Sequence, residues 1–194
     1  MSLFELYFKL GLQHIADLKG YDHILFILTL CAVYNLKEWK RVLILVTAFT
    51  IGHSLTLALA TLDLIRVDGD LIEFLIPLTI FLTALANVLS RQQRVTSTLH
   101  YVKYTAALFF GLIHGLGFSN YLRSLLGNEK GLVLPLFSFN VGIEAGQILI
   151  VAVIMLLTKV VVDLLHCPRR EWHLLLSGAG LGISLVLMIE RYPF

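Results

Sequence analysis

The sequence predicts an all-α protein: a polytopic transmembrane helical bundle of six or seven membrane helices, forming a single integral membrane domain over residues 1–194. Of its 194 residues, 58% are hydrophobic and only 14% are charged, whereas a soluble domain is nearer half apolar and a quarter charged. A soluble chain of this length has too small an interior to hide so much apolar surface. The remainder is therefore expected to face lipid.

Seven apolar runs, separated by short polar connectors, predict the order of the membrane helices. A spanning helix needs about 20 mostly apolar residues, and five of the runs reach that length comfortably. The run 21–36 is a little short. The run 2–18 carries four ionisable residues and is expected to span, to lie at the interface or to dip into the bilayer; without a basic leader it is expected to be retained. The runs are 2–18, 21–36, 39–62, 71–90, 101–126, 132–163 and 173–191.

The connectors alternate in charge, which predicts how the bundle is oriented. Connectors rich in Lys and Arg are expected in the cytoplasm, so the C-terminus is expected outside a bacterial plasma (inner) membrane. No concentrated basic face is visible, which argues against nucleic-acid binding. Self-association is left open. The cation-rich connectors contain Lys37, Lys40 and Arg41, then Arg91, Arg94 and Lys103, then Arg169 and Arg170; those at 63–70 and 127–131 are poorer in cations.

Ionisable residues inside membrane helices are costly, so they usually face the bundle interior and have a function. The first such cluster contains His14, Asp17, Asp22 and His23, with Gly20 permitting a sharp turn. His14 and Asp17 are three residues apart and share a helical face. Asp22 may be read as an N-cap of the next helix, but capping does not explain the histidines.

The second cluster is a polar stripe formed by Thr47, Thr50 and Ser54, with His53 beside it. A polar stripe on a membrane helix normally faces other helices. The stripe is expected either to bring His53 to a site or to leave it hydrogen-bonded between helices.

The third cluster surrounds His114 with glycines. Gly111 and Gly115 have the spacing that lets two membrane helices approach closely. The segment is expected to form a packing groove, a place where a ligand approaches His114, or both.

The fourth cluster lies on one helical face, because Asn140, Glu144 and Gln147 are spaced by four and then three residues. Glu144 lies about a dozen residues into a long apolar run, so it is expected to be protonated or paired with a cation, and we favour the pairing.

The expected topology places all four clusters in the outer half of the membrane, which predicts one shared site. Imidazole and carboxylate ligands without thiolates suit nickel, cobalt or zinc. Acceptors around the ligands are also expected; Asp17, Ser54, Asn140 and Gln147 are the candidates, and Glu73 is an entrance carboxylate or a cap. The predicted metal ligands are His14, Asp22, His23, His53, His114 and Glu144.

These same segments resemble the HupE/UreJ family of hydrogenase- and urease-associated membrane proteins, regarded as nickel or cobalt permeases. The resemblance implies metal uptake, with the six predicted ligands as ligands or relay points. It covers most of the chain and rests on His14 with Gly20–Phe26, on Thr47–Leu57, on Phe110–Phe118 and on Phe139–Gln147.

Two functions are favoured from the sequence, and an auxiliary metal-binding or structural subunit is a third that remains open. The first is a permease for a divalent transition metal, whose partners are the ion and the lipid bilayer; a polar site among glycine-interrupted helices is expected for transporters. The second is an intramembrane zinc-dependent hydrolase, in which three histidines hold the metal and Asp22, Glu144 or Ser54 assists.

Overall fold

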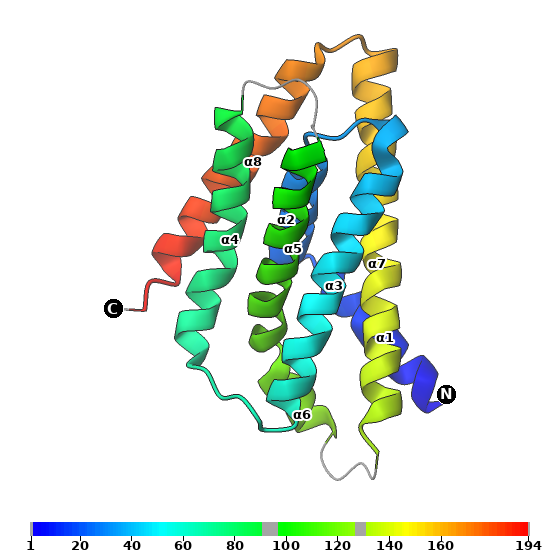
Figure 1. Ribbon diagram of the computed structural model, residues 1–194, viewed down its shortest axis with the longest axis vertical. Coiled ribbons are helices and arrows are strands. Elements are labelled where there is room, and N and C mark those ends of the chain that lie inside the picture. The colour runs from blue at the N-terminus through cyan, green and yellow to red at the C-terminus, as the bar shows by residue number, and fades with distance from the viewer. Residues whose placement is uncertain (1, 91–96, 127–130, 194) are drawn as a thin grey trace.

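The structure is a computed structural model that describes residues 2–90, 97–126 and 131–193. Throughout these residues the regular structure is helical, which confirms the all-α prediction (Figure 1). A 3₁₀ turn, Leu36–Glu38, precedes α3, and a π-helical turn, Val160–Leu164, follows α7. The α-helices are α1 (Leu3–Ile15), α2 (Asp22–Cys31), α3 (Trp39–Thr61), α4 (Gly69–Leu89), α5 (Ser97–Gly117), α6 (Ser119–Leu126), α7 (Val133–Lys159) and α8 (Arg169–Glu190).

Four helical segments of the described chain are long and apolar enough to cross a membrane. They are Leu36–Thr61, Gly69–Leu89, Val133–Leu164 and Arg169–Glu190. Their outward faces carry large apolar side chains that no part of the described chain covers, such as Ile51 of α3 and Leu156 of α7. A multi-pass membrane protein follows from these helices, because such faces are stable against lipid and not against water.

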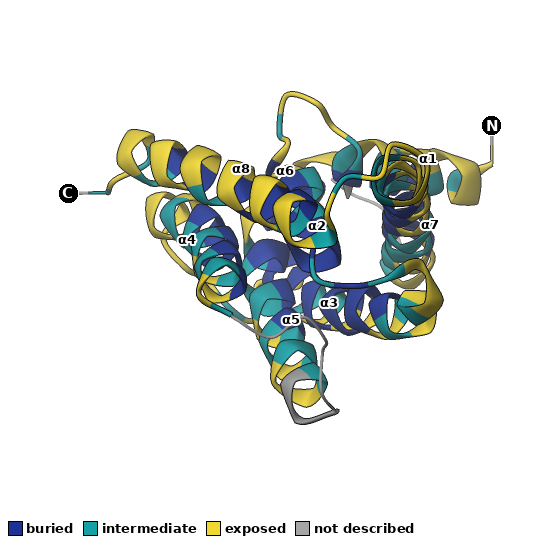
Figure 2. Cartoon of the chain, turned by 90° about the horizontal axis from the view of Figure 1, so that it is seen from above, coloured by how far each residue is buried: buried dark blue, intermediate teal, exposed yellow. Residues whose placement is uncertain are grey.

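The bundle is built around α2. Helices α3 and α5 pack along each other, as do α1 with α7 and α4 with α8. Seen from above, α2 lies in the middle, and the buried residues of the surrounding helices gather on the sides turned towards the centre (Figure 2). Eight of the ten residues of α2 are buried, so this short helix lies inside the protein.

The first two helices are each too short to cross a bilayer. Helix α1 has 13 residues and α2 has 10, which at 1.5 Å per residue gives about 20 and 15 Å. The hydrocarbon core is about 30 Å thick. In Figure 1, α1 rises to the middle of the molecule and α2 continues from there towards the upper end.

The structure divides the expected run 101–126 into two helices. Helix α5 ends at Gly117 and α6 begins at Ser119. The Ser119 hydroxyl donates to the carbonyl of Leu116 at 2.8 Å, a local bond that competes with continuation of the helix. The last helix begins at Arg169, four residues before the expected run 173–191.

The cation-rich connectors of the described chain meet at one end of the bundle. The start of α3, with Lys37 and Lys40, and the start of α8, with Arg169, both lie at the upper end in Figure 1, whereas the connector 63–70 lies at the lower end. This is the alternation that the charge pattern predicts. Arg91 and Arg94 lie outside the described residues.

Candidate metal centre

The candidate site begins at the turn between α1 and α2. The side chain of Asp17 closes this turn by accepting the backbone N–H of Lys19 at 2.8 Å, and it is exposed. Gly20 does not use a left-handed conformation here, and a Cβ at this position would make only an ordinary contact. The turn brings His14, near the end of α1, against His23, in the first turn of α2, with ring centroids 4.7 Å apart.

A third histidine reaches the same point from α3. The ring of His53 lies 5.8 Å from that of His14 and 6.1 Å from that of His23. One potential ligand nitrogen from each of the three lies within 4.8 Å of the others. His53 is fully buried and His23 is 7% exposed, so the three imidazoles face one another inside the protein.

Four nitrogens of these rings are buried without a hydrogen-bond partner. They are Nε2 of His14, Nε2 of His23 and both ring nitrogens of His53. A buried polar atom without a partner costs free energy, and four of them on three adjoining rings indicate a common ligand. A divalent transition metal fits the donor set, because neutral imidazole is a good ligand for nickel, cobalt and zinc.

His114 lies beside this group without belonging to it. Its ring is 5.2 Å from that of His23, but its Nε2 lies 3.0 Å from the hydroxyl oxygen of Thr79. Its Nδ1 is buried and has no partner. Among the described residues, the group close enough to share one ion contains His14, His23 and His53.

Glycines bring the histidine-bearing helices together. A Cβ at Gly111 of α5 would overlap the carbonyl oxygen of Phe49, and one at Gly115 would overlap that of His53. The close helix approach predicted from these two glycines is therefore present, and it places His114 against α3.

Glycines also allow a close approach of α1 and α7. A Cβ at Gly11 would overlap the carbonyl oxygen of Phe139, and one at Gly142 would overlap that of Phe8. Because α1 is only 13 residues long, this contact with a long helix holds His14 in place.

Polar side chains of α3 and α7 contact each other on the side of His53 that is nearer the start of α3, the upper end in Figure 1. The hydroxyl of Thr47 donates to Glu144 Oε1 and that of Thr50 to Gln147 Oε1, each at 2.6 Å. The other polar atom of each acceptor, Glu144 Oε2 and Gln147 Nε2, is buried without a partner, as is Oδ1 of Asn140. The predicted polar face of α7 therefore meets the predicted stripe of α3, and Glu144 is bonded to a hydroxyl rather than to a protein cation.

Asp22 is held by an arginine from the far end of the chain. Its Oδ2 lies 3.1 Å from Nη1 of Arg191, which directly follows α8. Its Oδ1 is buried without a partner. The capping interpretation is wrong, because Asp22 lies inside the first turn of α2 and Tyr21 occupies the N-cap.

The two remaining candidates are peripheral. Ser54 is half-buried on α3, and Glu73 is exposed on α4. Neither belongs to the three-histidine group found among the described residues.

Sequence reasoning gave no role to three residues that shape the site. The ring of Phe118, at the break between α5 and α6, lies 3.9 Å from that of His14 and stacks on Phe139 at 5.1 Å. Thr79 bonds His114, and Arg191 bonds Asp22. Phe118 lies within a recognised motif, but Thr79 and Arg191 had no local signal, since each contact joins distant segments.

Comparison with known proteins gives one family. A family model described as HupE / UreJ protein matches residues 1–190. No curated protein and no solved structure matches the chain.

Proposed function

The chain belongs to the HupE/UreJ family, and from this membership and the buried histidines we propose that it is a membrane permease for a divalent transition metal. The metal is the cargo, and His14, His23 and His53 are its ligands. The family points to nickel or cobalt, and imidazole donors also accept zinc. No finding supports the alternative of an intramembrane zinc hydrolase.

The observation that carries this proposal is the group of three imidazoles, those of His23 and His53 buried and that of His14 half-buried. Their ligand atoms lie within 4.8 Å of one another, and four of their ring nitrogens are buried without a hydrogen-bond partner. Three protein ligands leave coordination positions open, which suits an ion that has to enter and leave. A closed four-ligand site would hold it structurally.

The arrangement of helices supports transport rather than storage. We place six crossings in the membrane, the first made jointly by α1 and α2. Two of the three cargo ligands, His14 and His23, lie on either side of the interruption between these two helices, as in transporters whose binding sites lie at broken helices. His114 and Glu144, each with a buried unpartnered atom, are relay positions next to the site.

The test is metal content and metal flux of the same purified protein. Elemental analysis in detergent is expected to find about one nickel, cobalt or zinc ion per chain after loading. Reconstituted liposomes are expected to take up that metal down its gradient. His53→Ala should lose both, because it removes one of three ligands. The matched control is His166→Asn, which removes an exposed histidine of a connector and keeps a residue that tolerates its positive φ of 57°.

The possible results distinguish the proposed metal site from the proposed transport activity. A wild-type protein that binds none of the three metals contradicts the site. Binding without flux under any ion gradient contradicts the permease and indicates an accessory metal-binding protein. Equal loss in His53→Ala and His166→Asn would show damage to the fold rather than to a ligand set.

A further inference from the structure

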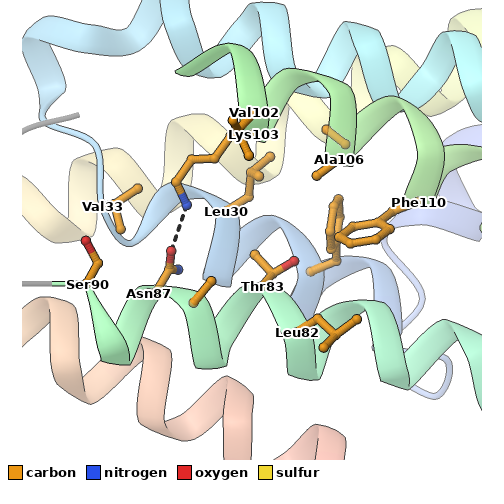
Figure 3. A pocket seen from close by; sticks show the side chains of 13 residues that line it. Leu30, Val33, Leu82, Thr83, Asn87, Ser90, Val102, Lys103, Ala106 and Phe110 are labelled. Atoms are coloured by element: carbon orange, nitrogen blue, oxygen red, sulfur yellow. Dashed lines mark hydrogen bonds between the residues drawn. The ribbon is translucent and has the colours of Figure 1, made fainter. Parts of the chain in front are cut away.

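A fissure on the other side of Phe26 from the histidines has a distinct chemical character. It lies between α2, α4 and α5 and has a volume of about 220 Å³ (Figure 3). This is less than the roughly 300–1,000 Å³ of pockets for drug-sized ligands, so it fits a narrow molecule or one chain of a larger one. Most of its lining is apolar, and its polar residues are Thr83, Asn87, Ser90 and Lys103.

The fissure is polar at one end and apolar at the other. Figure 3 shows Asn87, Ser90 and Lys103 grouped at one end and Leu82 and Phe110 at the other. Ser90 directly follows α4, so the polar end lies near the helix ends. The apolar end points towards the middle of the bundle.

The polar end carries a positive charge that the described protein does not neutralise. Lys103 Nζ donates to the side-chain oxygen of Asn87 at 2.8 Å, and the Asn87 amide donates to the carbonyl of Thr29 at 2.7 Å. An ammonium has three donors, and no ion pair joins Lys103 to a described carboxylate. A cation in an apolar environment is usually stabilised by an anionic partner.

The fissure opens sideways between α4 and α5. Leu82 of α4 and Val102 of α5 line it and are 46% and 60% exposed, and both belong to the apolar outer surface of the bundle. A ligand therefore reaches the fissure from the bilayer.

We propose that this fissure binds an anionic phospholipid, with the phosphate at Lys103 and one acyl chain along the apolar wall towards Phe26. The polar end lies where lipid headgroups lie, near the helix ends. The apolar end runs to the depth of acyl chains. Basic pockets between membrane helices are known to hold anionic headgroups.

The test measures lipid binding to the full-length protein in detergent by native mass spectrometry, with phosphatidylglycerol and phosphatidylcholine of the same chains. Both headgroups offer a phosphate to Lys103, but the choline ammonium cancels the net charge of phosphatidylcholine, so phosphatidylglycerol is expected to bind about tenfold more tightly. Lys103→Gln should abolish that preference and weaken phosphatidylcholine binding less than phosphatidylglycerol binding. Lys37→Gln, which removes an exposed cation at the same end of the bundle, should behave as wild type.

A second variant keeps the test decisive if Lys103→Gln does not fold. Ala106→Phe fills the apolar part of the fissure and should weaken both lipids. The proposal is overturned if wild type binds both lipids equally, if Lys103→Gln retains the preference, or if Ala106→Phe binds as wild type. A free fatty acid that binds more tightly than phosphatidylglycerol would replace the phospholipid by a carboxylate ligand. None of these readouts depends on metal transport.

Discussion

Single residues carry most of what could be predicted about the site. His14, His23 and His53 stand out in the sequence because an imidazole within an apolar run needs a reason to be there. Their joint position is seen in the structure, where the three rings meet. The residues that hold them are harder to predict. Asp22 and its partner Arg191 are 169 positions apart, and no periodicity or motif links a carboxylate in α2 to a guanidinium after α8.

The Asp22–Arg191 ion pair is expected to stabilise the start of α2, next to His23. The two side chains are 13% and 27% exposed, so the pair is partly shielded from solvent. We expect a coupling of about 1 kcal/mol, the upper end of the range for accessible pairs. A double-mutant cycle with Asp22→Asn and Arg191→Gln, read out by thermal unfolding of the purified protein, measures this coupling. Additive effects of the two substitutions would show that the pair contributes nothing.

At the scale of helices, the apolar runs predict which elements exist but not where they are interrupted. The runs 39–62 and 71–90 correspond closely to α3 (Trp39–Thr61) and α4 (Gly69–Leu89). The interruption at Phe118 was not predicted, although Ser119, Asn120 and Arg123 make the chain more polar directly after it. It arises from a local bond of Ser119 and from packing of Phe118 on other helices. Helix length follows from composition, whereas a break follows from tertiary contacts.

The close approach of α3 and α5 gives a prediction at the same scale. Gly115→Ala is expected to destabilise the protein by about 1–3 kcal/mol, the cost of overpacking a tight contact, because the new methyl group overlaps the His53 carbonyl oxygen. It should also weaken metal binding by displacing His53. The matched control is Gly178→Ala on α8, where a Cβ meets nothing within 4 Å. Thermal unfolding and metal titration of both variants check this, and equal stability of the two would contradict the packing argument.

At the scale of the whole molecule, the charges of the connectors predict which end of the bundle faces the cytoplasm. That orientation in turn predicts the side from which an ion approaches the histidines. The cation-rich ends of α3 and α8 lie at one end of the bundle (Figure 1). The positive-inside rule assigns that end to the cytoplasm. His14 and His23 lie at the junction of α1 and α2, and α1 approaches from the opposite end. With that end in the cytoplasm, we predict that an ion reaches the histidines from outside the cell, which is the direction that uptake requires.

Cysteine labelling tests this orientation with the residues that the chain already contains. Cys31 is buried, whereas Cys167 is partly exposed in the connector before α8. We expect a membrane-impermeant maleimide to label wild-type protein in spheroplasts only after permeabilisation, because Cys167 faces the cytoplasm. Leu64 is 68% exposed in the connector before α4, and a cysteine at this position reports on the opposite side of the membrane. Leu64→Cys in a Cys167→Ser background should be labelled from outside without permeabilisation. The reverse pattern would place the approach along α1 on the cytoplasmic side, and the proposed permease would then have to export its metal.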